Sequence, residues 1–271
     1  MIFFININKI MLMNRSYSDS ALVISLKASG ENNSTVTLLT KTRGIIYATL
    51  YGGPKSRLRS LVTQWNSGII YLYEAPEKKQ TKISDFDVKN YHSSFSLSLY
   101  KNFAANLASE LCIKTKCGGS FEECWHLTSG FMDGLELANE EQAQVGLIRF
   151  LWRYLELLGI QPPSHACSAC GQSFLSSRLS PDSKTYYNGI ENNFICSECL
   201  AGGLGHSEYN FFLKLSALRY LAGITVLSPA EARKLQIDRQ DYLQLKDLVF
   251  FLIENAVGSK LNTIETGAGI L

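Results

Sequence analysis

The feature that most constrains this chain is a repeated cysteine pair. Two residues separate Cys167 from Cys170 and Cys196 from Cys199, and 25 residues lie between the pairs. Each CxxC turn can direct two sulfurs at one ion, so two such turns predict a tetrahedral four-thiolate zinc site. A closed four-sulfur site is structural, because zinc without an open coordination position cannot activate water. The spacing therefore predicts a zinc module at residues 165–202 and says little about function.

Two disulfides are the alternative use of these four cysteines, and chance spacing is a third explanation. The chain has seven cysteines, and Cys112, Cys117 and Cys124 lie in stretches with helical periodicity, which leaves an odd number to pair. Residues 1–12 are apolar, but polar residues interrupt them and they lack a small-residue cleavage site, so they do not resemble an export signal. A reducing cytosol is therefore expected, where such pairs hold metal.

Charge is distributed unevenly, although the formal net charge is only +2. Residues 1–82 contain 11 basic and four acidic residues, an excess of +7, whereas the remainder carries −5. A basic first third of the chain, followed by an acidic remainder, favours a polyanion-binding domain attached to a second domain that carries it. Ordinary variation in charge between domains is the alternative explanation. No run of about 18 apolar residues occurs, so no membrane span is expected.

The first third of the chain has the pattern of a small β-barrel. Segments rich in Val, Ile, Thr and Tyr alternate with turns that contain glycine. The expected strands are residues 21–26, 34–39, 45–50 and 68–73. About five short strands with glycine turns suit a barrel, which predicts a first domain at residues 1–82.

A helical pattern begins at about residue 87. Apolar residues recur at steps of three and four between Tyr100 and Leu111, and a second helix is expected at about 121–137. A third helix should span about 140–158, and its apolar centre predicts that it is buried.

Local signals mark the ends of these helices. Asn139 and Gln142 have the spacing of an N-terminal capping box at the start of the third helix. Together these segments predict a helical domain at residues 83–164. Residues 203–271 should add C-terminal helices, at about 207–222 and 229–257, that pack on this domain.

The sequence contains no recognisable catalytic frame. The glycine-rich nucleotide loops and the nucleophile elbow are absent. His206 and Glu208 match the H-x-E of zinc deaminases, but that signature precedes its cysteine pair, and here it follows both pairs. His92, His126 and His206 are interpreted as surface or packing residues. The same holds for His165, although it lies close enough to Cys167 to replace a thiolate.

A short basic segment follows the third expected strand. It begins with Gly52 and Gly53 and carries Lys55, Arg57 and Arg59 within five positions. Cations that follow phosphates, beside rings that stack on bases, are how barrels of this type bind single strands. The candidate DNA-binding residues are the cations Arg43, Lys55, Arg57 and Arg59 and the rings Tyr51 and Trp65. The alternative is a solvated loop whose aromatic residues belong to the core.

These features, in this order, resemble the bacterial RecO family over roughly residues 20–261. The shared motifs are T-L-L-T-x-x-x-G (37–44), G-G-P-K-S-R (52–57), F-L-W-R-Y-L-E-L-L-G-I-Q-P (150–162) and the C-S-A-C-G and C-S-E-C pairs. A helix that ends in Leu-Gly-x-x-Pro just before a CxxC-Gly is the most specific of them.

The resemblance implies an N-terminal OB barrel, a helical body, a zinc module and further helices. It implies binding to single- and double-stranded DNA, annealing of complementary strands without ATP, and cooperation with RecR in loading RecA onto strands coated by the single-strand-binding protein (SSB). RecF and RecA would be engaged indirectly, and the location would be the bacterial cytoplasm at the nucleoid.

The chain departs from the family pattern at two places. Glu31-Asn32-Asn33 stands where the family usually has an acidic E-x-D. About 13 extra residues precede the usual beginning, so Met11 or Met13 is an alternative start and residues 1–13 an alternative, non-native extension.

The expected fold class is therefore α+β: an OB-fold barrel, a helical body and a four-cysteine, zinc-ribbon-like module. The expected function is a non-enzymatic DNA-binding mediator of recombinational repair with one structural zinc ion per chain. The main alternative is a nucleic-acid-modifying enzyme built on a barrel and a zinc ribbon, which needs a nucleotide or methyl-donor loop or an open metal site. A pure protein-interaction scaffold is a third hypothesis.

The resemblance also implies that the chain binds the C-terminal tail of SSB. That tail is short and acidic and ends in an apolar residue with a free carboxylate, so its site requires an apolar pocket rimmed by cations. Arg149 and Arg153 are four positions apart on the third expected helix, beside Phe150 and Trp152, and are the candidate residues. Ordinary solvated arginines are the alternative.

Overall fold

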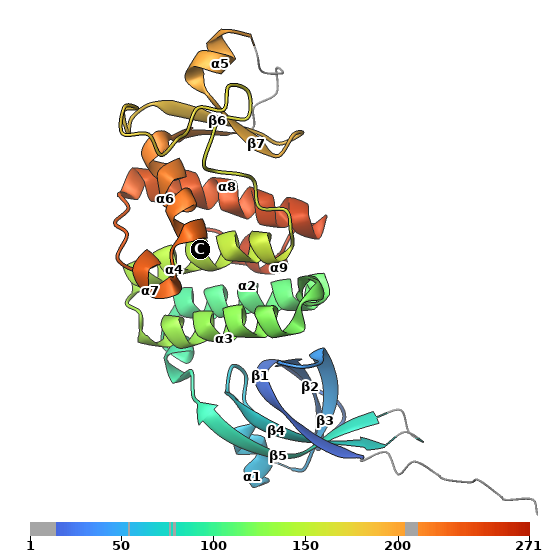
Figure 1. Ribbon diagram of the computed structural model, residues 1–271. Coiled ribbons are helices and arrows are strands. Elements are labelled where there is room, and N and C mark those ends of the chain that lie inside the picture. The colour runs from blue at the N-terminus through green and yellow to red at the C-terminus, as the bar shows by residue number, and fades with distance from the viewer. Residues whose placement is uncertain (1–14, 54, 76, 78–79, 204–210) are drawn as a thin grey trace, which may run out of the picture. The chain divides into compact units, whose positions relative to one another are not determined.

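The computed structural model describes residues 15–53, 55–75, 77, 80–203 and 211–271 (Figure 1). The extension at 1–13, the alternative starts Met11 and Met13, and the H-x-E at His206 lie outside the described residues. The chain divides into two compact units. The first contains the described residues up to 42 together with 46–91, and the second contains 43–45 and 92–271.

The first unit is a closed β-barrel with the strand order β1-β2-β3-β5-β4 within the described residues. Its elements are β1 (Ser16–Ala28), β2 (Asn33–Thr40), β3 (Gly44–Tyr51), α1 (Arg57–Leu61), β4 (Ser67–Ala75) and β5 (Gln80–Asn90). β1 pairs antiparallel with both β2 and β4, and β3 pairs parallel with β5. This order is that of an OB-like barrel, so the predicted fold class is confirmed for this unit.

Strand alternation fills the barrel. Side chains at every second position of a strand point to the same side, so the apolar positions of the strands converge on one core. The core residues include Val23, Val36, Leu38, Leu50, Ile70, Leu72 and Phe86. Their intervening neighbours therefore form the outer surface of the barrel.

The predicted barrel boundary at residue 82 is wrong, because it falls inside β5. The first unit extends to Tyr91. Ile83 and Phe86 both pack in the core although they are three positions apart, since the register with β4 shifts and leaves Ser84 as a bulge. The bulge interrupts the alternation by which a strand is recognised in a sequence, and β5 is not among the strands expected from the sequence.

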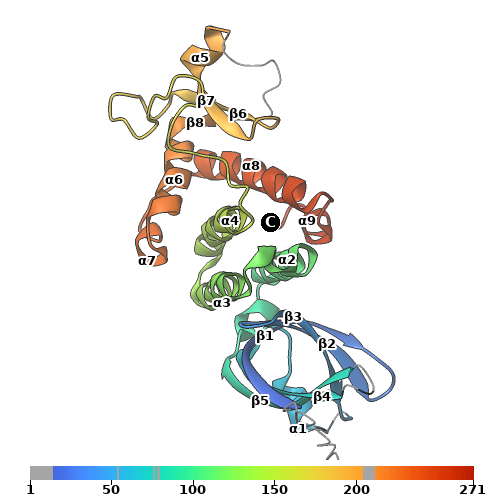
Figure 2. The same ribbon diagram turned by 45° about the vertical axis from the view of Figure 1, so that its right-hand side comes forward.

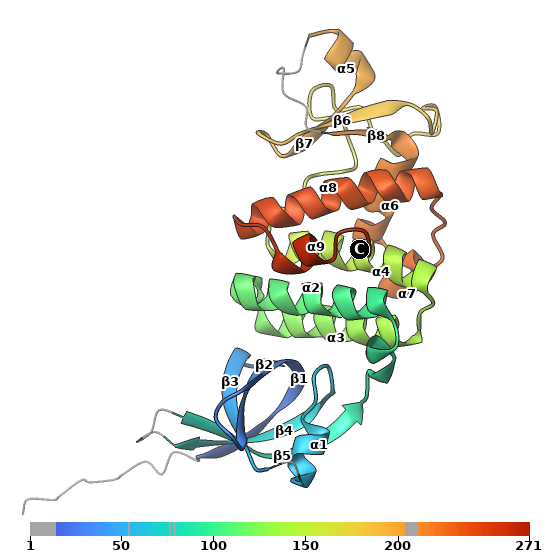
Figure 3. The same cartoon turned by 180° about the vertical axis from the view of Figure 1, so that it is seen from behind.

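The second unit is built mainly of helices (Figures 2 and 3). The longer ones are α2 (Leu99–Thr115), α3 (Phe121–Leu137), α4 (Glu140–Leu157), α6 (Leu215–Val226) and α8 (Arg239–Val257). Short helices lie at η2 (Ser93–Ser96), η3 (Lys116–Gly119), α7 (Pro229–Ala232) and α9 (Asn262–Thr266). α4 packs against α2, α3, α6 and α8, so it lies at the centre of this unit.

The predicted properties of α4 are confirmed. Asn139 Oδ1 accepts a hydrogen bond from the backbone N–H of Gln142 at 2.9 Å, and the N–H of Asn139 donates to Gln142 Oε1 at 3.1 Å. This capping box satisfies two of the N–H groups that a helix start leaves without intrahelical partners. Leu151, Trp152 and Tyr154 are buried along the helix, as its apolar centre predicts.

The first C-terminal helix begins later than predicted, and the second is interrupted. Residues 211–214 form a strand, β8 (Phe211–Lys214), and α6 starts only at Leu215. The second predicted helix is divided in two, because Asp238 caps a separate helix by accepting from the N–H of Asp241 at 2.8 Å. None of the helices among the described residues is both long and apolar enough to cross a bilayer.

A small sheet completes the second unit at the end that carries α6 and α8 (Figure 1). It contains β6 (Lys184–Asn188), β7 (Asn193–Cys196) and β8 in the order β7-β6-β8, and α5 (Ser197–Ala201) follows β7. Arg219 of α6 donates to the carbonyl oxygens of Phe174, Ser176 and Leu179 at 2.6–3.1 Å. This guanidinium therefore ties the loop before β6 to the helical body.

Candidate functional site

The four cysteines of the two CxxC pairs converge, as predicted. Their sulfur atoms all lie within 4.8 Å of one another. The Sγ atoms of Cys167 and Cys199 are 3.8 Å apart, and those of Cys170 and Cys196 are 3.9 Å apart. A tetrahedral ion with metal–sulfur bonds of about 2.3 Å, the value for zinc, places its sulfurs about 3.8 Å apart. The donor set and its spacing therefore fit a tetrahedral metal ion.

Two backbone turns hold the thiols in this arrangement. In the first, the N–H of Cys167 donates to the Gln172 carbonyl and the N–H of Gly171 donates to the Cys167 carbonyl, both at 2.9 Å. Gly171 adopts a positive φ of 73°, which glycine accepts without steric cost. In the second turn, Cys196 ends β7 and Cys199 lies in the first turn of α5.

A backbone hydrogen bond joins these two turns. The N–H of Ser168 donates to the Phe194 carbonyl at 2.9 Å, so the first pair is fixed against the strand that carries the second. Cys167, Cys196 and Cys199 are buried, whereas Cys170 is exposed. The cluster consists of cysteines alone, and His165 does not belong to it.

Backbone amides favour the charged form of one sulfur. Burial acts to raise the pKa of Cys167, but the N–H groups of Cys170, Cys196 and Ala169 outweigh it and lower that pKa to about 7. The N–H of Cys196 is 3.3 Å from Cys167 Sγ. Amide donors to sulfur favour the thiolate, which is the form that binds metal.

The other three cysteines pack together inside the helical body. Cys112, Cys117 and Cys124 are fully buried, and the Sγ atoms of Cys112 and Cys124 are 3.7 Å apart. The hydroxyl groups of Thr128 and Tyr154 also lie against this group, at 3.3 Å from Cys112 Sγ and 3.8 Å from Cys124 Sγ. These cysteines are core residues of α2, η3 and α3, and among the described residues the metal centre is confined to the CxxC pairs.

The basic segment forms the turn between β3 and α1. Lys55 and Arg57 are exposed, and Arg59 is half-buried with its Nη1 3.3 Å from the carbonyl oxygen of Gly52. Gly52 has a φ of 118°, and a Cβ at this position would lie 2.9 Å from the Ser56 side chain. The turn therefore requires glycine there and presents the cations at the surface.

Two candidate DNA-binding residues lie elsewhere. Arg43 is exposed in the turn between β2 and β3 and groups with the second unit. Trp65 is only 8% exposed, and its backbone N–H donates to the Val23 carbonyl. Its ring faces are not accessible, so the prediction that Trp65 stacks on a base is wrong. Tyr51, at 41% exposed, remains accessible.

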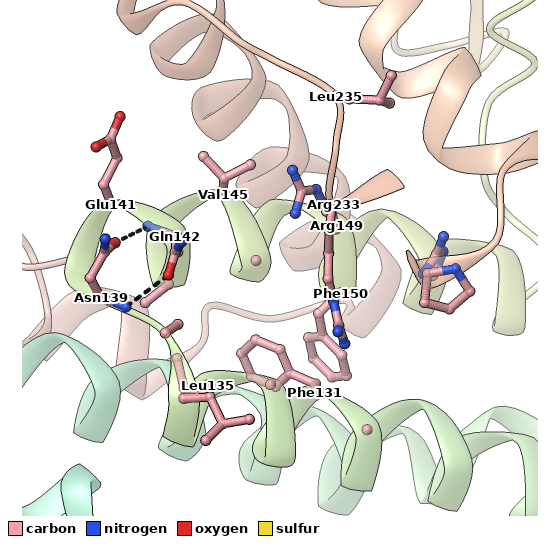
Figure 4. Close-up of a pocket in the computed structure, with 18 of the residues that line it drawn as sticks. Phe131, Leu135, Asn139, Glu141, Gln142, Val145, Arg149, Phe150, Arg233 and Leu235 are labelled. Carbon is pink, nitrogen blue, oxygen red and sulfur yellow. Dashed lines mark hydrogen bonds between the residues drawn. The ribbon is translucent and has the colours of Figure 1, made fainter. Parts of the chain in front are cut away.

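The helical body contains a pocket of about 630 Å³ between α3, α4 and the segment that includes α7 (Figure 4). Its apolar wall includes Phe131, Leu135, Val145, Phe150 and Leu235. The rings of Phe131 and Phe150 stack with their centroids 4.4 Å apart. The volume lies within the range of about 300–1,000 Å³ that is typical of ligand sites.

Three arginines line this pocket: Arg149, Arg153 and Arg233. Arg149 Nε donates to the Tyr220 hydroxyl at 2.7 Å, and Arg153 donates to the carbonyls of Ile224 and Leu227 at 3.3 and 3.0 Å. Burial is the main cause that lowers the pKa of Arg153; the charge of Glu156 partly offsets it, and the positive charges of Arg149 and Arg233 add to it. The pocket is therefore electropositive, and a bound anion would relieve this repulsion.

The structure brings Arg149, Arg153 and Phe150 together at this pocket, as their spacing on α4 predicts. Trp152 does not join them, since it is buried and donates from Nε1 to Thr225 Oγ1 at 3.0 Å. No pattern in the sequence pointed to Arg233, because it is more than 80 residues from Arg149 in the chain and only the fold places it here.

A family model and a curated relative both match this chain. The family model described as "Recombination protein O C terminal" matches residues 97–264, more than half of the chain. A curated relative, "DNA repair protein RecO" of Solidesulfovibrio magneticus, is 27% identical over 168 residues, which cover 58% of this chain and 64% of the relative. The match thus spans slightly less than two thirds of that relative's length. The family-model match lies in the second unit and does not include the barrel.

Proposed function

This chain belongs to the RecO family of DNA repair and recombination proteins, and from that premise we propose that it is a non-enzymatic DNA-binding mediator of recombinational repair. The family match across the helical body is the observation that carries this proposal. In this role the protein binds single- and double-stranded DNA, anneals complementary strands, and works with RecR to load RecA onto SSB-coated DNA. Its place is the bacterial cytoplasm, and RecF and RecA are indirect partners.

The barrel supplies the DNA contacts in this proposal. Lys55, Arg57 and Arg59 follow a glycine turn on the barrel surface, and Arg43 is a further exposed cation. Each cation that meets a phosphate releases counterions, which makes binding salt-dependent. The exposed ring of Tyr51 at the end of β3 can stack on an unpaired base.

One zinc ion per chain is bound by Cys167, Cys170, Cys196 and Cys199 in this proposal. Four thiolates fill the tetrahedral shell, so the ion has a structural role and supplies no catalytic position. Its place in the fold is between the turn after Ala166 and the start of α5, where it would lock the two turns together. The enzymatic alternative requires a nucleotide or methyl-donor loop or an open metal position, and a complete four-thiolate shell does not provide the last of these.

The pocket of the helical body is the proposed site for the acidic C-terminal tail of SSB. An acidic peptide with a final apolar residue matches an apolar pocket that carries three arginines and, among its lining residues, the single acidic residue Glu141. Arginine forks bind carboxylates with two hydrogen bonds, which suits a free C-terminus.

Binding measurements test both parts of the proposal. Fluorescence anisotropy with labelled single- and double-stranded DNA, over a salt series and with and without RecR, should give binding of both forms that weakens steeply with salt. A protein that binds neither form at low salt would contradict the DNA-binding role. An annealing assay without ATP then separates a mediator from a passive binder.

The tail site has its own test. A labelled acidic tail peptide should bind, and the same peptide without its last residue should bind more weakly. Arg233→Ala should weaken tail binding, whereas Lys234→Ala, at the adjacent exposed position outside the pocket, should not. Equal binding of both peptides, or equal binding by both variants, would rule out this pocket.

A further inference from the structure

The outer surface of the barrel carries a group of tyrosines that the family match does not cover. Because Ala48 and Leu50 face the core, Tyr47 and Tyr51 of β3 face outward. By the same alternation Tyr71 and Tyr73 of β4 and Lys82 of β5 also face outward, since their neighbours Leu72 and Ile83 are core residues. We call Tyr47, Tyr51, Tyr71, Tyr73 and Lys82 the tyrosine face.

The strand register places these side chains on adjacent strands. β5 lies between β3 and β4 in the barrel. Lys82 is opposite Thr49 of β3 on one side and Tyr73 of β4 on the other. The cation is therefore at the centre of the face, with rings on both sides.

The rings are unusually exposed for large apolar groups. Tyr47 is 61%, Tyr51 41% and Tyr71 43% exposed. Tyrosine combines a flat apolar ring with a polar tip and is common where a protein meets a partner. Single exposed rings are ordinary, but several on one face of a small barrel indicate a contact surface.

Hydrogen bonds hold part of the face in place. The Tyr51 hydroxyl donates to Gln80 Oε1 at 3.0 Å, and Gln80 Nε2 donates to Thr49 Oγ1 at 2.9 Å. The Lys82 ammonium lies 5.1 Å from the centre of the Tyr51 ring. Arg15 adds a second cation, which interacts with the side chain of Tyr73 and lies 4.0 Å from Glu77 Oε1. Rings and cations are thus arranged before any ligand arrives.

The charged side chains around the tyrosine face determine where the phosphates of a polyanion can bind. Asp85 is opposite Tyr71 in the register, and Asp87 follows two positions later. Asp87 is paired with Lys89 at 2.6 Å, whereas Asp85 accepts the N–H of Phe86 at 2.8 Å and keeps its negative charge beside Tyr71. A phosphate chain would therefore follow the side of the face that carries Lys82 and Arg15.

The free energies of the two possible contacts with the Tyr51 ring favour a stacked base over the Lys82 ammonium. An exposed cation–π contact such as that of Lys82 with Tyr51 contributes roughly 0.5–1 kcal/mol. A base stacked on an aromatic side chain contributes about 1–3 kcal/mol. A base can thus displace the ammonium from the ring, and the freed cation stays next to the phosphate of the same nucleotide.

We propose that the tyrosine face binds unpaired nucleobases of single-stranded nucleic acid by stacking, with Lys82 beside the phosphates. The inference rests on the proposed DNA binding and refines it, because it assigns strand selectivity to the rings of this face and not to the cations of the basic turn, which begins directly after Tyr51. In a duplex the flat faces of the bases are covered by their neighbours, so this surface selects single strands. The basic turn, which meets only phosphates, serves both forms.

The test uses the double variant Tyr47→Ala with Tyr71→Ala in the full chain. Its affinity for a labelled single strand should fall about tenfold or more, while its affinity for duplex DNA and the salt dependence of both should stay as in the wild type. The matched control is Tyr91→Ala, which removes an exposed tyrosine outside the face. Lys82→Gln should instead reduce the salt slope by about 0.7 on single strands.

The outcomes separate this inference from the proposed function. If the wild type binds DNA and the double variant binds single strands equally well, the tyrosine face is overturned and the DNA-binding role stands. The same conclusion follows if the variant loses single- and double-strand binding equally, or loses only the binding of RecR. A wild type that binds no DNA overturns both.

Discussion

The barrel and the second unit hold their candidate binding residues in opposite ways. On the barrel, Lys55, Arg57 and Tyr51 are exposed on a turn and on the outside of a closed strand ladder. In the second unit, Arg149 and Arg153 face a pocket but also donate to a hydroxyl and to backbone carbonyls. A substitution on the barrel surface should therefore change binding alone, whereas one in the second unit should change stability as well.

The largest expected effect on stability is that of a substitution in the metal centre of the second unit. Cys196→Ser removes one of four thiolates, and binding of a structural zinc ion contributes about 10–16 kcal/mol of folding free energy in zinc-finger peptides. We expect loss of the bound zinc by elemental analysis and proteolytic cleavage within about residues 165–214. DNA binding by the barrel should persist in any soluble fraction, because the barrel contains none of the ligands.

Ser168→Ala serves as the control, since it changes a residue between two ligands without removing a sulfur. Wild-type protein that contains no zinc when purified without chelator would contradict the assignment. Equal proteolytic stability of Cys196→Ser and Ser168→Ala would show that the ion does not support this module.

Arg219 should produce the next largest effect. Its guanidinium donates to the carbonyls of Phe174, Ser176 and Leu179. Arg219→Ala leaves these acceptors without that donor, which costs about 1–3 kcal/mol for buried groups. Thermal unfolding should show a lower Tm for Arg219→Ala and an unchanged Tm for Arg178→Ala, an exposed arginine of the same loop. Equal Tm values would mean that the metal turn and the sheet alone hold this module.

The contrast also explains which features the sequence could predict. Local patterns predicted the CxxC cluster, the capping box of α4 and the strands β1 to β4, because spacing and alternation determine these within a few residues. The bulge at Ser84 broke the alternation of β5 and hid that strand. β8 is four residues long and exists through its pairing with β6, so its own residues carry no clear strand signal.

Local sequence patterns also did not predict which side chains are accessible, because accessibility depends on contacts between distant parts of the chain. Trp65 follows a basic turn in the sequence, yet contacts with distant parts of the chain bury it. Arg233 joins Arg149 and Arg153 only because α7 packs against α6 and brings the end of α7 to the pocket. Spacing on one helix predicts which residues share a face, but it does not predict what another element adds to that face.

Charge reversal on the basic turn should affect binding without affecting the fold. Arg57→Glu with Arg59→Glu removes two expected phosphate contacts, so the slope of log affinity against log salt on single strands should fall by about 0.7 for each. The affinity should drop about tenfold near physiological salt, while the Tm should fall only by the loss of the Arg59 hydrogen bond to the Gly52 carbonyl. Arg178→Glu with Lys260→Glu gives the same change in net charge on the second unit and should leave the slope unaltered. Equal slopes for the two double variants would place the DNA contacts outside this turn.

The smallest expected effect concerns a buried acid near the start of α8. Asp241 is buried, and its Oδ1 has no hydrogen-bond partner among the described residues. Burial is the main cause that raises the pKa of this carboxyl, helped by the charges of Asp238 and Asp182, and the hydrogen bond from Ser216 only partly offsets it.

A raised pKa in the folded state means that ionisation destabilises the fold. Stability from the neutral carboxyl is fully present below the unfolded pKa of about 3.9 and is lost as pH rises through the folded pKa. Asp241→Asn keeps an acceptor for Ser216 and cannot ionise, so it should raise the Tm by about 2 °C or less at pH 7.5 and by less at pH 4.5. Asp247→Asn, an exposed acid further along α8, is the control. A Tm difference that does not grow with pH would show that the Asp241 carboxyl is neutral or well solvated in the folded protein. Ionisation of this buried acid would then not destabilise the second unit.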